Sequence, residues 1–398
     1  NEQHFRAVTS LLGPALVFAG AGSGKTRTLT SRVSYRVAIG ILPENILLLT
    51  FTNKAAREML TRVEELMPGS TAGIWGGTFH SIGARILRKH AEKVGYTRSF
   101  TILDSEDQRS LLAKVIKETG VAKEAKERLG EKFPKPAVIA SILGMAANTG
   151  VEVETILAEN YEFFEETDAG ILKVAEVYAE KKLAANCMDF DDLLTKTLEL
   201  LSKSEEVRKS FQSQFQFILV DEFQDTNAVQ GEVIDLLAEG HGNLMVVGDD
   251  AQSIYSWRGA DYRNILEFPD RYQDAKVYKI ETNYRSVPEV LELANNAIRA
   301  NKRQFEKQLC ADRKPRGQLP ALVPVNEPNT QAAFVAQRVL ELRDEGIELE
   351  EMAVLYRAHF QAMELQLELT HRNIPFNITS GLRFFEQAHI KDVAAFMK

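Results

Sequence analysis

The sequence has only two cysteines, Cys187 and Cys310, and they stand far apart. No CxxC pair or Cys/His cluster accompanies them, so neither a disulfide framework nor a structural zinc site is indicated. Long apolar runs are also lacking. The charge-free stretch 7–24 is interrupted by glycines and Pro14, which is unsuitable for a membrane span of about 20 apolar residues. We therefore expect a reducing, cytosolic protein without a transmembrane or secretory segment.

Glycine and proline are also modest in number, 24 and 12 of 398 residues. Together with 44% hydrophobic and 26% charged residues, this composition excludes collagen-like, low-complexity and wholly disordered proteins. At about 150 residues per domain, the length predicts two or three globular domains.

Positive charge does not predominate, because the net charge is −8. A phosphate backbone responds to local charge rather than to the sum. The charge is uneven: 151–168 carries seven acids and no base, whereas 301–316 carries six bases and two acids. The simplest interpretation of each run is a solvated helix face or loop, so neither run alone assigns a partner.

Short apolar runs alternate with helical patterns, which indicates a parallel sheet covered on both faces, the α/β class. Between about 86 and 182 this rhythm changes to an almost strand-free, helix-like insertion rich in lysine and glutamate. A second α/β segment begins near residue 276. The predicted strands are 15–19, 46–51, 217–220, 244–247, 276–280, 321–325 and 352–356.

A glycine-rich loop follows the first predicted strand directly and precedes a helix-like run. Glycines let successive backbone N–H groups surround phosphate oxygens, a lysine meets the terminal phosphates, and a threonine hydroxyl reaches Mg²⁺. Ala19 replaces the usual first glycine at a position that only begins the loop. The predicted phosphate-binding residues are Gly22, Ser23, Gly24, Lys25 and Thr26.

Two carboxylates, Asp221 and Glu222, end the apolar run 217–220. Asp221 is placed to hold Mg²⁺, and Glu222 is placed to orient or deprotonate the attacking water. Alone, such a pair is often an exposed strand end. Beside a phosphate loop it indicates an NTP hydrolase rather than a kinase. The sequence has no Asn-Lys-x-Asp guanine reader, since Asn53-Lys54 is followed by two alanines, so ATP is the predicted nucleotide.

Aromatic and cationic residues gather in a third motif, 247–259, where Gln252 is followed by Tyr255, Trp257 and Arg258. Bases stack on aromatic rings and arginine binds phosphate, so this motif predicts a single-stranded nucleic-acid surface. The alternative is that Tyr255 and Trp257 pack in the core.

Together these motifs resemble, in order over the whole chain, the motif series of UvrD/Rep/PcrA-type superfamily 1 DNA helicases. The matching segments are 50–56, 77–81, 221–227, 248–260 and 283–286, with 188–194 at the end of the helical insertion. The resemblance implies two RecA-like domains with ATP between them and single-stranded DNA across their tops, moving 3′ to 5′.

The resemblance also implies roles for nucleotide-site residues. The catalytic set would be Lys25, Glu222, Gln252 and Arg285. In it, Gln252 senses the γ-phosphate and Arg285 reaches it from the second domain. Tyr284 and Arg27 would sandwich the adenine. The family reads adenine with a glutamine three residues before an Ala-Val pair; that position is His4 here and Gln3 is one place away, so both are candidates.

The DNA path implied by the resemblance includes residues from several motifs. Its candidates are Phe51, Asn53, Tyr255, Trp257 and Arg258, with His80 and Arg357 nearby. For His80 a structural role is the alternative. For Asp189, Asp191 and Asp192 we expect a structural role at the return from the insertion rather than metal binding.

The chain departs from the family pattern at several points. Phe223 stands where tyrosine is common, and the later motifs of these helicases are not found before Lys398. Asn1 also begins inside the first motif. We therefore expect an N-terminal portion of a longer helicase that, in isolation, is weakly active.

The predicted fold is α/β, a RecA-like P-loop NTPase domain with a helical insertion plus an incomplete second RecA-like domain. The expected division is 1–90 with 184–275, then 91–183 for the insertion and 276–398 for the second domain. The predicted function is an ATP-dependent 3′–5′ DNA helicase that uses ATP and Mg²⁺ and binds single-stranded DNA and single-strand/double-strand junctions in the bacterial cytosol or nucleoid. Two alternatives remain: the motor of a helicase-nuclease, or a non-unwinding, ATP-gated single-strand binder. No protein partner is indicated.

Overall fold

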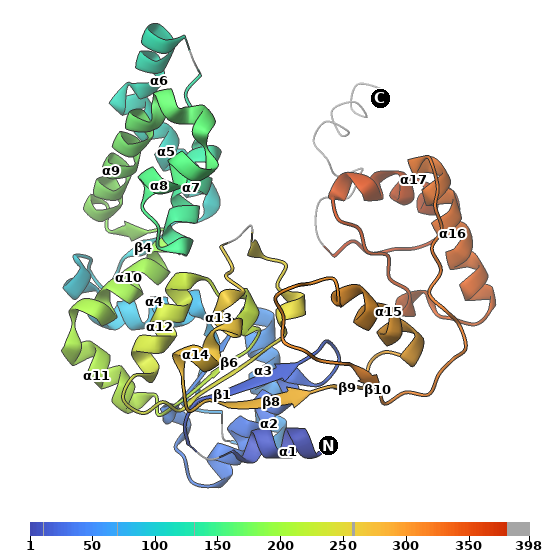
Figure 1. The fold of residues 1–398 in the computed structure, drawn as a ribbon. Helices are drawn as coiled ribbons and strands as arrows, with labels where there is room; N and C mark the ends of the chain where they lie inside the picture. Colours follow the sequence, from blue (N-terminus) through green and yellow to red (C-terminus); the bar gives the residue numbers. More distant parts are fainter. Residues whose placement is uncertain (11, 70, 131, 257–258, 380–398) are drawn as a thin grey trace. The chain divides into compact units, whose positions relative to one another are not determined.

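The computed structural model describes residues 1–10, 12–69, 71–130, 132–256 and 259–379 (Figure 1). They form two units, Asn1–Leu319 and the residues from Pro320 onward, and each unit is described by itself. In the first unit the predicted strands 15–19, 46–51, 217–220, 244–247 and 276–280 all form, within one residue at their ends. The α/β class is confirmed.

Six parallel strands form the sheet of the first unit. In spatial order they are β3 (Trp75–Thr78), β2 (Ile46–Thr50), β6 (Phe217–Val220), β7 (Leu244–Gly248), β1 (Ala15–Ala19) and β8 (Lys276–Ile280). Val17 of β1 pairs with Val247 of β7 and with Tyr278 of β8. The chain passes from β1 across β7 and β6 to reach β2. In such sheets, ligands bind at the carboxyl ends of the strands where the strand order reverses.

Alternate side chains of the inner strands pack on opposite faces of the sheet, as the two-residue period of a strand requires. Leu16 and Phe18 pack toward α4 (Phe79–His90), α10 (Phe190–Lys203), α11 (Glu205–Gln214), α12 (Ala228–Ala238) and the short α13 (Arg263–Leu266) and α14 (Phe268–Arg271). Val17 and Ala19 pack toward α1 (Glu2–Thr9), α2 (Lys25–Ala38) and α3 (Asn53–Leu66). Both faces are covered, so these strands are apolar throughout.

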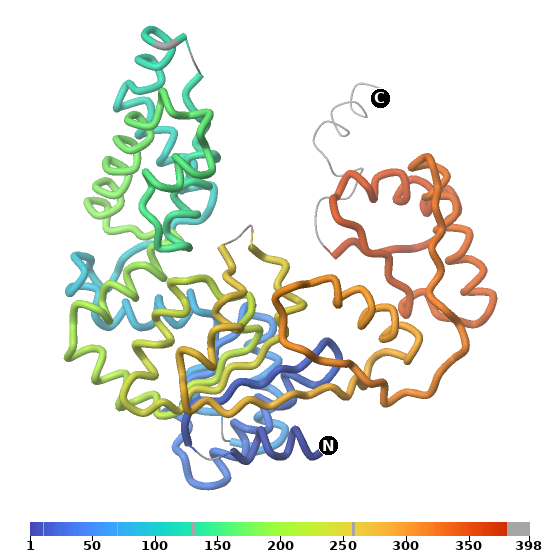
Figure 2. The backbone as a smooth tube through the Cα atoms, viewed as in Figure 1, coloured from blue at the N-terminus to red at the C-terminus, as the bar shows by residue number. Residues whose placement is uncertain are grey.

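The helical segment leaves and rejoins the sheet domain at neighbouring points (Figure 2). Strand β4 (Thr101–Ile102) precedes it and pairs in parallel with β5 (Cys187–Met188), which follows it. Between them lie α5 (Ser105–Thr119), α6 (Val121–Glu124), a π-helical turn (Ala125–Leu129), α7 (Pro136–Thr149), α8 (Val153–Asn160) and α9 (Asp168–Ala184). These residues are helical as predicted, while their division as a domain of 91–183 stays a prediction.

The return from the helical segment is fixed by buried charges. Asp189 caps α10, and Asp192 completes a capping box with it. Lys182 of α9 forms ion pairs of 2.7 Å with Asp189 and 2.5 Å with Asp192. The expected structural role of these two aspartates is confirmed.

The segment after β7 differs from the expected division at one strand. β8, assigned from sequence to the second domain, is the edge strand of the first sheet. Beyond it, β9 (Thr282–Asn283) pairs with β10 (Cys310–Ala311), and α15 (Pro288–Ile298) lies between them in sequence. The rest of the domain division stays a prediction.

The second unit, as far as residue 379, is built on α16 (Pro328–Asp344) and α17 (Met363–His371), which pack through Ala336 and Leu369. Short 3₁₀ turns lie at Leu349–Glu351 and His359–Ala362. The strands predicted at 321–325 and 352–356 do not form. A strand needs a neighbour to complete its backbone hydrogen bonds, and the described part of this unit supplies none. Within the described ranges no single helix is long and apolar enough to cross a membrane; α7 and α8 reach that measure only as a pair bent by 113°.

Candidate nucleotide site and nucleic-acid interface

The phosphate loop lies at the carboxyl end of β1 and leads into α2. Gly22 and Gly24 have φ angles of 70° and 94°, in the left-handed region that glycine adopts without strain. The Ser23 hydroxyl donates to the carbonyl of Gly20 at 2.7 Å and closes the turn. A Cβ on Gly22 would lie 2.6 Å from the Cβ of Arg285, so a side chain there would displace the backbone that carries this arginine.

Lys25, the first residue of α2, forms an ion pair with Glu222 just beyond β6, and the lysine side chain is only 9% exposed. The same carboxylate oxygen accepts a hydrogen bond of 3.0 Å from Nε2 of Gln224. Glu222 has φ 49°, a left-handed conformation that costs non-glycine residues about 1–3 kcal/mol and is concentrated at functional sites. The structure therefore brings together the predicted phosphate-binding lysine and the predicted water-activating carboxylate.

Two buried carboxylates lie beside this pair. The backbone N–H of Asp221 donates to the carbonyl of Leu49 at 2.9 Å, whereas its Oδ1 has no hydrogen-bond partner. Burial, and then the charge of Glu222, raise the pKa of Asp221 to about 7. The same two causes raise the pKa of Asp225 to about 6, and its Oδ1 also lacks a partner. An unpartnered buried carboxylate oxygen fits a hard divalent cation.

Gln252 is linked to the acidic motif through Asp249. Its Nε2 donates to Oδ2 of Asp249 at 2.5 Å. The backbone N–H of Asp249 in turn donates to Oε1 of Gln224 at 2.9 Å. Since Gln224 also binds Glu222, the predicted γ-phosphate sensor and the predicted water activator share one hydrogen-bonded network.

The predicted adenine end gathers around the start of α1. His4 Nε2 lies 2.9 Å from the carbonyl oxygen of Ser23, and its ring centroid lies 6.3 Å from that of Tyr284. Burial lowers the pKa of His4, and the charge of Arg27 lowers it further. Gln3 is exposed, and its backbone N–H donates to Asn1. Of the two adenine-reader candidates, the structure brings His4 to the phosphate loop.

A cavity of about 380 Å³ lies between the carboxyl ends of β2 and β3 and helix α7, and its lining includes Phe51, His80 and Asn148. The rings of Phe51 and Tyr255 stack with centroids 5.5 Å apart and planes at 24°. Tyr255 is half-buried rather than in the core. Trp257 and Arg258 lie outside the described residues, so their roles stay predictions.

The remaining DNA candidates are distributed around this cavity and beyond it. His80 packs edge-on against Phe190 at 6.1 Å, and burial lowers the pKa of its imidazole. Asn53, the first residue of α3, lines an open groove with Arg57 and Ser81. Arg357 is exposed in the second unit, where its backbone N–H donates to Gln361 at 2.9 Å. The DNA-binding role of each remains a prediction.

Two models of known protein families match almost the whole chain. A family model described as the UvrD/REP helicase N-terminal domain matches residues 1–273, and one described as the UvrD-like helicase C-terminal domain matches 278–398. The chain belongs to the UvrD/REP helicase family. Two similar curated relatives, both named ATP-dependent DNA helicase PcrA, are 37% identical to it: one from Staphylococcus epidermidis over 402 residues and one from Staphylococcus aureus over 410. Each alignment covers 100% of this chain and 53% of the relative, so the chain spans about half the length of these proteins.

Asn148 of α7 makes contacts that the sequence motifs of this UvrD/REP chain did not indicate. Its Nδ2 donates to Asp191 at 3.1 Å, and its Oδ1 accepts from Asn227 at 2.6 Å. It also packs against Gly259, where a Cβ would lie 2.8 Å from that of Asn148. Asn148 therefore joins helix α7 to three of the matching motif segments, 188–194, 221–227 and 248–260. A single asparagine within a helix has no sequence pattern, so only the fold identifies it.

Asp191 provides a prediction about pH. Burial raises its pKa to about 6, above the value of about 3.9 for an unfolded chain. Between these values the folded chain keeps a proton that the unfolded chain releases, so Asp191 lowers the free energy of unfolding as pH rises. Asp191→Asn should therefore stabilise the protein by about 1 kcal/mol more near pH 8 than near pH 5, measured by urea unfolding. Asp270→Asn, a change at an exposed position, is the control. If Asp191→Asn changed the free energy of unfolding equally at both pH values, the prediction would be contradicted.

Proposed function

We propose that this chain carries the ATP-hydrolysing and single-strand-binding part of an ATP-dependent DNA helicase that moves 3′ to 5′ along single-stranded DNA. One observation carries the proposal: the Lys25–Glu222 pair and a cavity flanked by stacked aromatic rings lie along the same carboxyl edge of one sheet. The printed names of the PcrA relatives support the same activity.

In this proposal the phosphate loop surrounds the phosphates of ATP with the backbone N–H groups of Gly22, Ser23 and Gly24. Lys25 exchanges its partner from Glu222 to the terminal phosphates. Glu222 is then free to accept a proton from the attacking water. The ion pair therefore keeps the two groups together until the substrate separates them.

The residues beside this pair fit Mg²⁺. Thr26 and Asp221 would hold the ion, since a buried carboxylate oxygen without a partner and a hydroxyl are oxygen donors that Mg²⁺ prefers. When bound, Mg²⁺ neutralises charge that develops on the phosphates. A cation beside Asp221 would favour its charged form, which burial otherwise disfavours.

The other nucleotide contacts come from the sensor network and from the strand end after β8. Gln252 would contact the γ-phosphate, and Arg285 would bind the charge that develops during transfer. Tyr284 and Arg27 would enclose the adenine. His4, rather than the exposed Gln3, is the proposed reader of its edge.

The DNA path would follow the cavity lined by Phe51 and His80 and the groove at the starts of α3 and α4. Phe51 and Tyr255 would stack on bases, as Trp257 would, and Arg258 would bind phosphate. Thr52 and Thr78 cap α3 and α4, and such helix starts bind phosphates through backbone N–H groups. Asn53, His80 and Arg357 are the further proposed contacts. The proposed substrates are single strands and single-strand/double-strand junctions, in the bacterial cytosol or nucleoid.

The proposal is tested by strand displacement with the full gene product. With ATP and Mg²⁺ it should release the short strand of a duplex with a 3′ single-stranded tail, and do so much more slowly from a matched 5′-tailed or blunt duplex. Lys25→Ala is the inactive control. Displacement from the 5′ tail alone would contradict the polarity. Nucleotide-dependent DNA binding without displacement would favour the non-unwinding alternative.

A further inference from the structure

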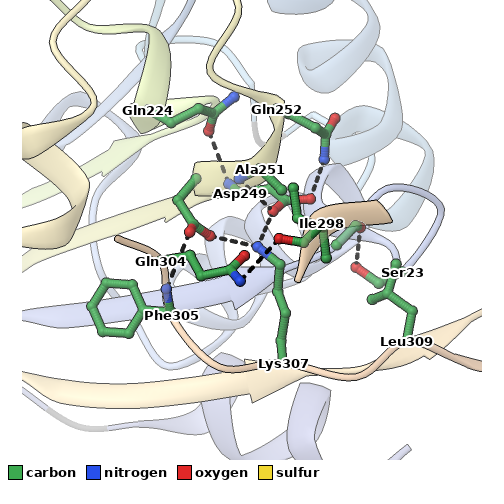
Figure 3. Close-up of polar contacts among 12 residues, drawn as sticks. Ser23, Gln224, Asp249, Ala251, Gln252, Ile298, Gln304, Phe305, Lys307 and Leu309 are labelled. Atoms are coloured by element: carbon green, nitrogen blue, oxygen red, sulfur yellow. Dashed lines mark hydrogen bonds and ion pairs between the residues drawn. The ribbon is translucent and has the colours of Figure 1, made fainter. Parts of the chain in front are cut away.

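Residues 304–311 lie across the carboxyl edge of the sheet, beside the phosphate loop (Figure 3). The ring centroids of Phe305 and Phe18 lie 3.7 Å apart, and Phe18 belongs to β1, the strand that leads into the loop. Leu309 packs against Gly20, where a Cβ would lie 2.3 Å from its side chain. Asn295 of α15 holds Leu309 by hydrogen bonds to its backbone N–H and carbonyl, 3.1 and 2.9 Å long.

From this segment Lys307 reaches two adjacent carboxylates. Its ammonium forms ion pairs with Asp249 and Asp250, and these side chains are nearly buried, at 8% exposure for the lysine and 4% for each aspartate. Asp250 also accepts a hydrogen bond of 3.1 Å from the backbone N–H of Phe305. Figure 3 shows Lys307 directed at Asp249, with Gln252 bonded to the same carboxylate.

Two neighbouring buried carboxylates cannot both stay charged without a nearby cation, because each is desolvated and repels the other. Lys307 supplies that cation. With it, Asp249 stays a fixed acceptor that holds the amide of Gln252. Without it, the two carboxylates repel each other with no counter-charge, so Asp249 would move toward water and Gln252 would lose its anchor.

We propose that Lys307 is a positioning residue for ATP hydrolysis, which acts on Gln252 through Asp249. The inference rests on the proposed function, in which Gln252 contacts the γ-phosphate. Lys307 lies outside every motif on which the family resemblance rests. It belongs to the basic run 301–316, in which it is a buried member rather than part of a solvated face. It also ties residues 304–311 to the sensor, so the position of that segment and the geometry of the ATP site depend on each other.

The test compares Lys307→Met with Lys307→Arg and with a matched control, Lys279→Met, in the full gene product. Lys279 lies in β8 and donates to the backbone carbonyl of Glu306 at 2.9 Å, so it holds the same segment without contacting the carboxylates. Lys307→Met should lower kcat for DNA-stimulated ATP hydrolysis by about tenfold to a hundredfold, since misplacing a reacting group by about 1 Å has effects of this size. KM for ATP should change by less than about threefold, because the lost contact belongs to the transition state. Lys307→Arg should recover much of the rate, and Lys279→Met should keep it.

A double-mutant cycle separates positioning from general damage. If Lys307 acts through Gln252, adding Lys307→Met to Gln252→Ala should lower kcat little further. If the two single-variant losses of kcat multiplied in the double variant, the inference would be overturned. A loss of kcat in Lys279→Met equal to that in Lys307→Met would overturn it as well. Should Lys307→Met not fold, the charge-balanced Lys307→Met/Asp250→Asn variant carries the same cycle. Absence of ATP turnover in the unaltered protein would overturn the proposed function and this inference with it; turnover with multiplying losses would overturn this inference alone.

Discussion

Glu222→Gln should lower the rate of ATP turnover by about 10²- to 10⁴-fold and leave nucleotide binding intact. The amide keeps the size of the carboxylate and its hydrogen bond to Gln224 but cannot accept a proton from water. Because Lys25 is paired with Glu222, removing the charge of the carboxylate also frees the lysine. ATP affinity should therefore be unchanged or tighter.

Lys25→Ala is the complementary change. It removes the cation that meets the terminal phosphates, so both triphosphate affinity and turnover should be lost. Phosphate release and titration with a fluorescent nucleotide measure the two effects separately. The control is Glu232→Gln, an exposed change on α12 that should alter neither. Normal turnover in Glu222→Gln would refute its assignment as the group that activates water.

Arg285→Ala should lower turnover by about 10³- to 10⁵-fold, the effect of removing an arginine from phosphoryl transfer. The structure places its backbone beside the phosphate loop. The backbone N–H of Tyr284 donates to the carbonyl of Gly22 at 2.9 Å, and Asn283 Nδ2 donates to the carbonyl of Ala21. Asn283 Oδ1 then accepts the N–H of Arg285 at 2.9 Å.

The Arg285 side chain is itself exposed, so its loss should leave the melting temperature nearly unchanged. Arg313→Ala is the matched control, because Arg313 is an exposed arginine nearby that donates to the carbonyl of Tyr284 at 3.2 Å. A rate in Arg285→Ala equal to that of the control would show that another group stabilises the transferred phosphate.

Much of the fold follows from local sequence, because an inner strand of a parallel sheet is buried on both faces and is read as a continuous apolar run. β1 and β6 are such strands. β3 was not predicted, because its two glycines, Gly76 and Gly77, make it resemble a turn. At Gly76 a Cβ would lie 2.9 Å from a methyl group of Leu60, so this side chain packs closely against the strand. The apolar runs 321–325 and 352–356 resemble strands, yet Leu322 and Leu355 are 93% and 94% exposed. An apolar pattern does not reveal whether a pairing partner exists.

The candidate site likewise contains residues that local sequence predicts and residues that only the fold identifies. Residues within the loop and the strand ends, such as Lys25 and Glu222, were predicted because their chemistry depends on local spacing and on parallel strands ending at one edge. Lys307 and Asn148 were not predicted, because their partners lie 58 and 79 residues away in sequence, Asp249 for the first and Asn227 for the second. The raised pKa of Asp221 also depends on tertiary burial, which no motif records.

The most direct test of the central claim, that ATP hydrolysis at the Lys25–Glu222 site is coupled to single-stranded DNA, is the steady-state rate of phosphate release by the full gene product. The rate is measured with and without a single-stranded oligonucleotide, beside Glu222→Gln. We expect hydrolysis that requires Mg²⁺, rises strongly with the oligonucleotide and disappears in Glu222→Gln. A rate that the oligonucleotide leaves unchanged, or one that persists in Glu222→Gln, would contradict the account.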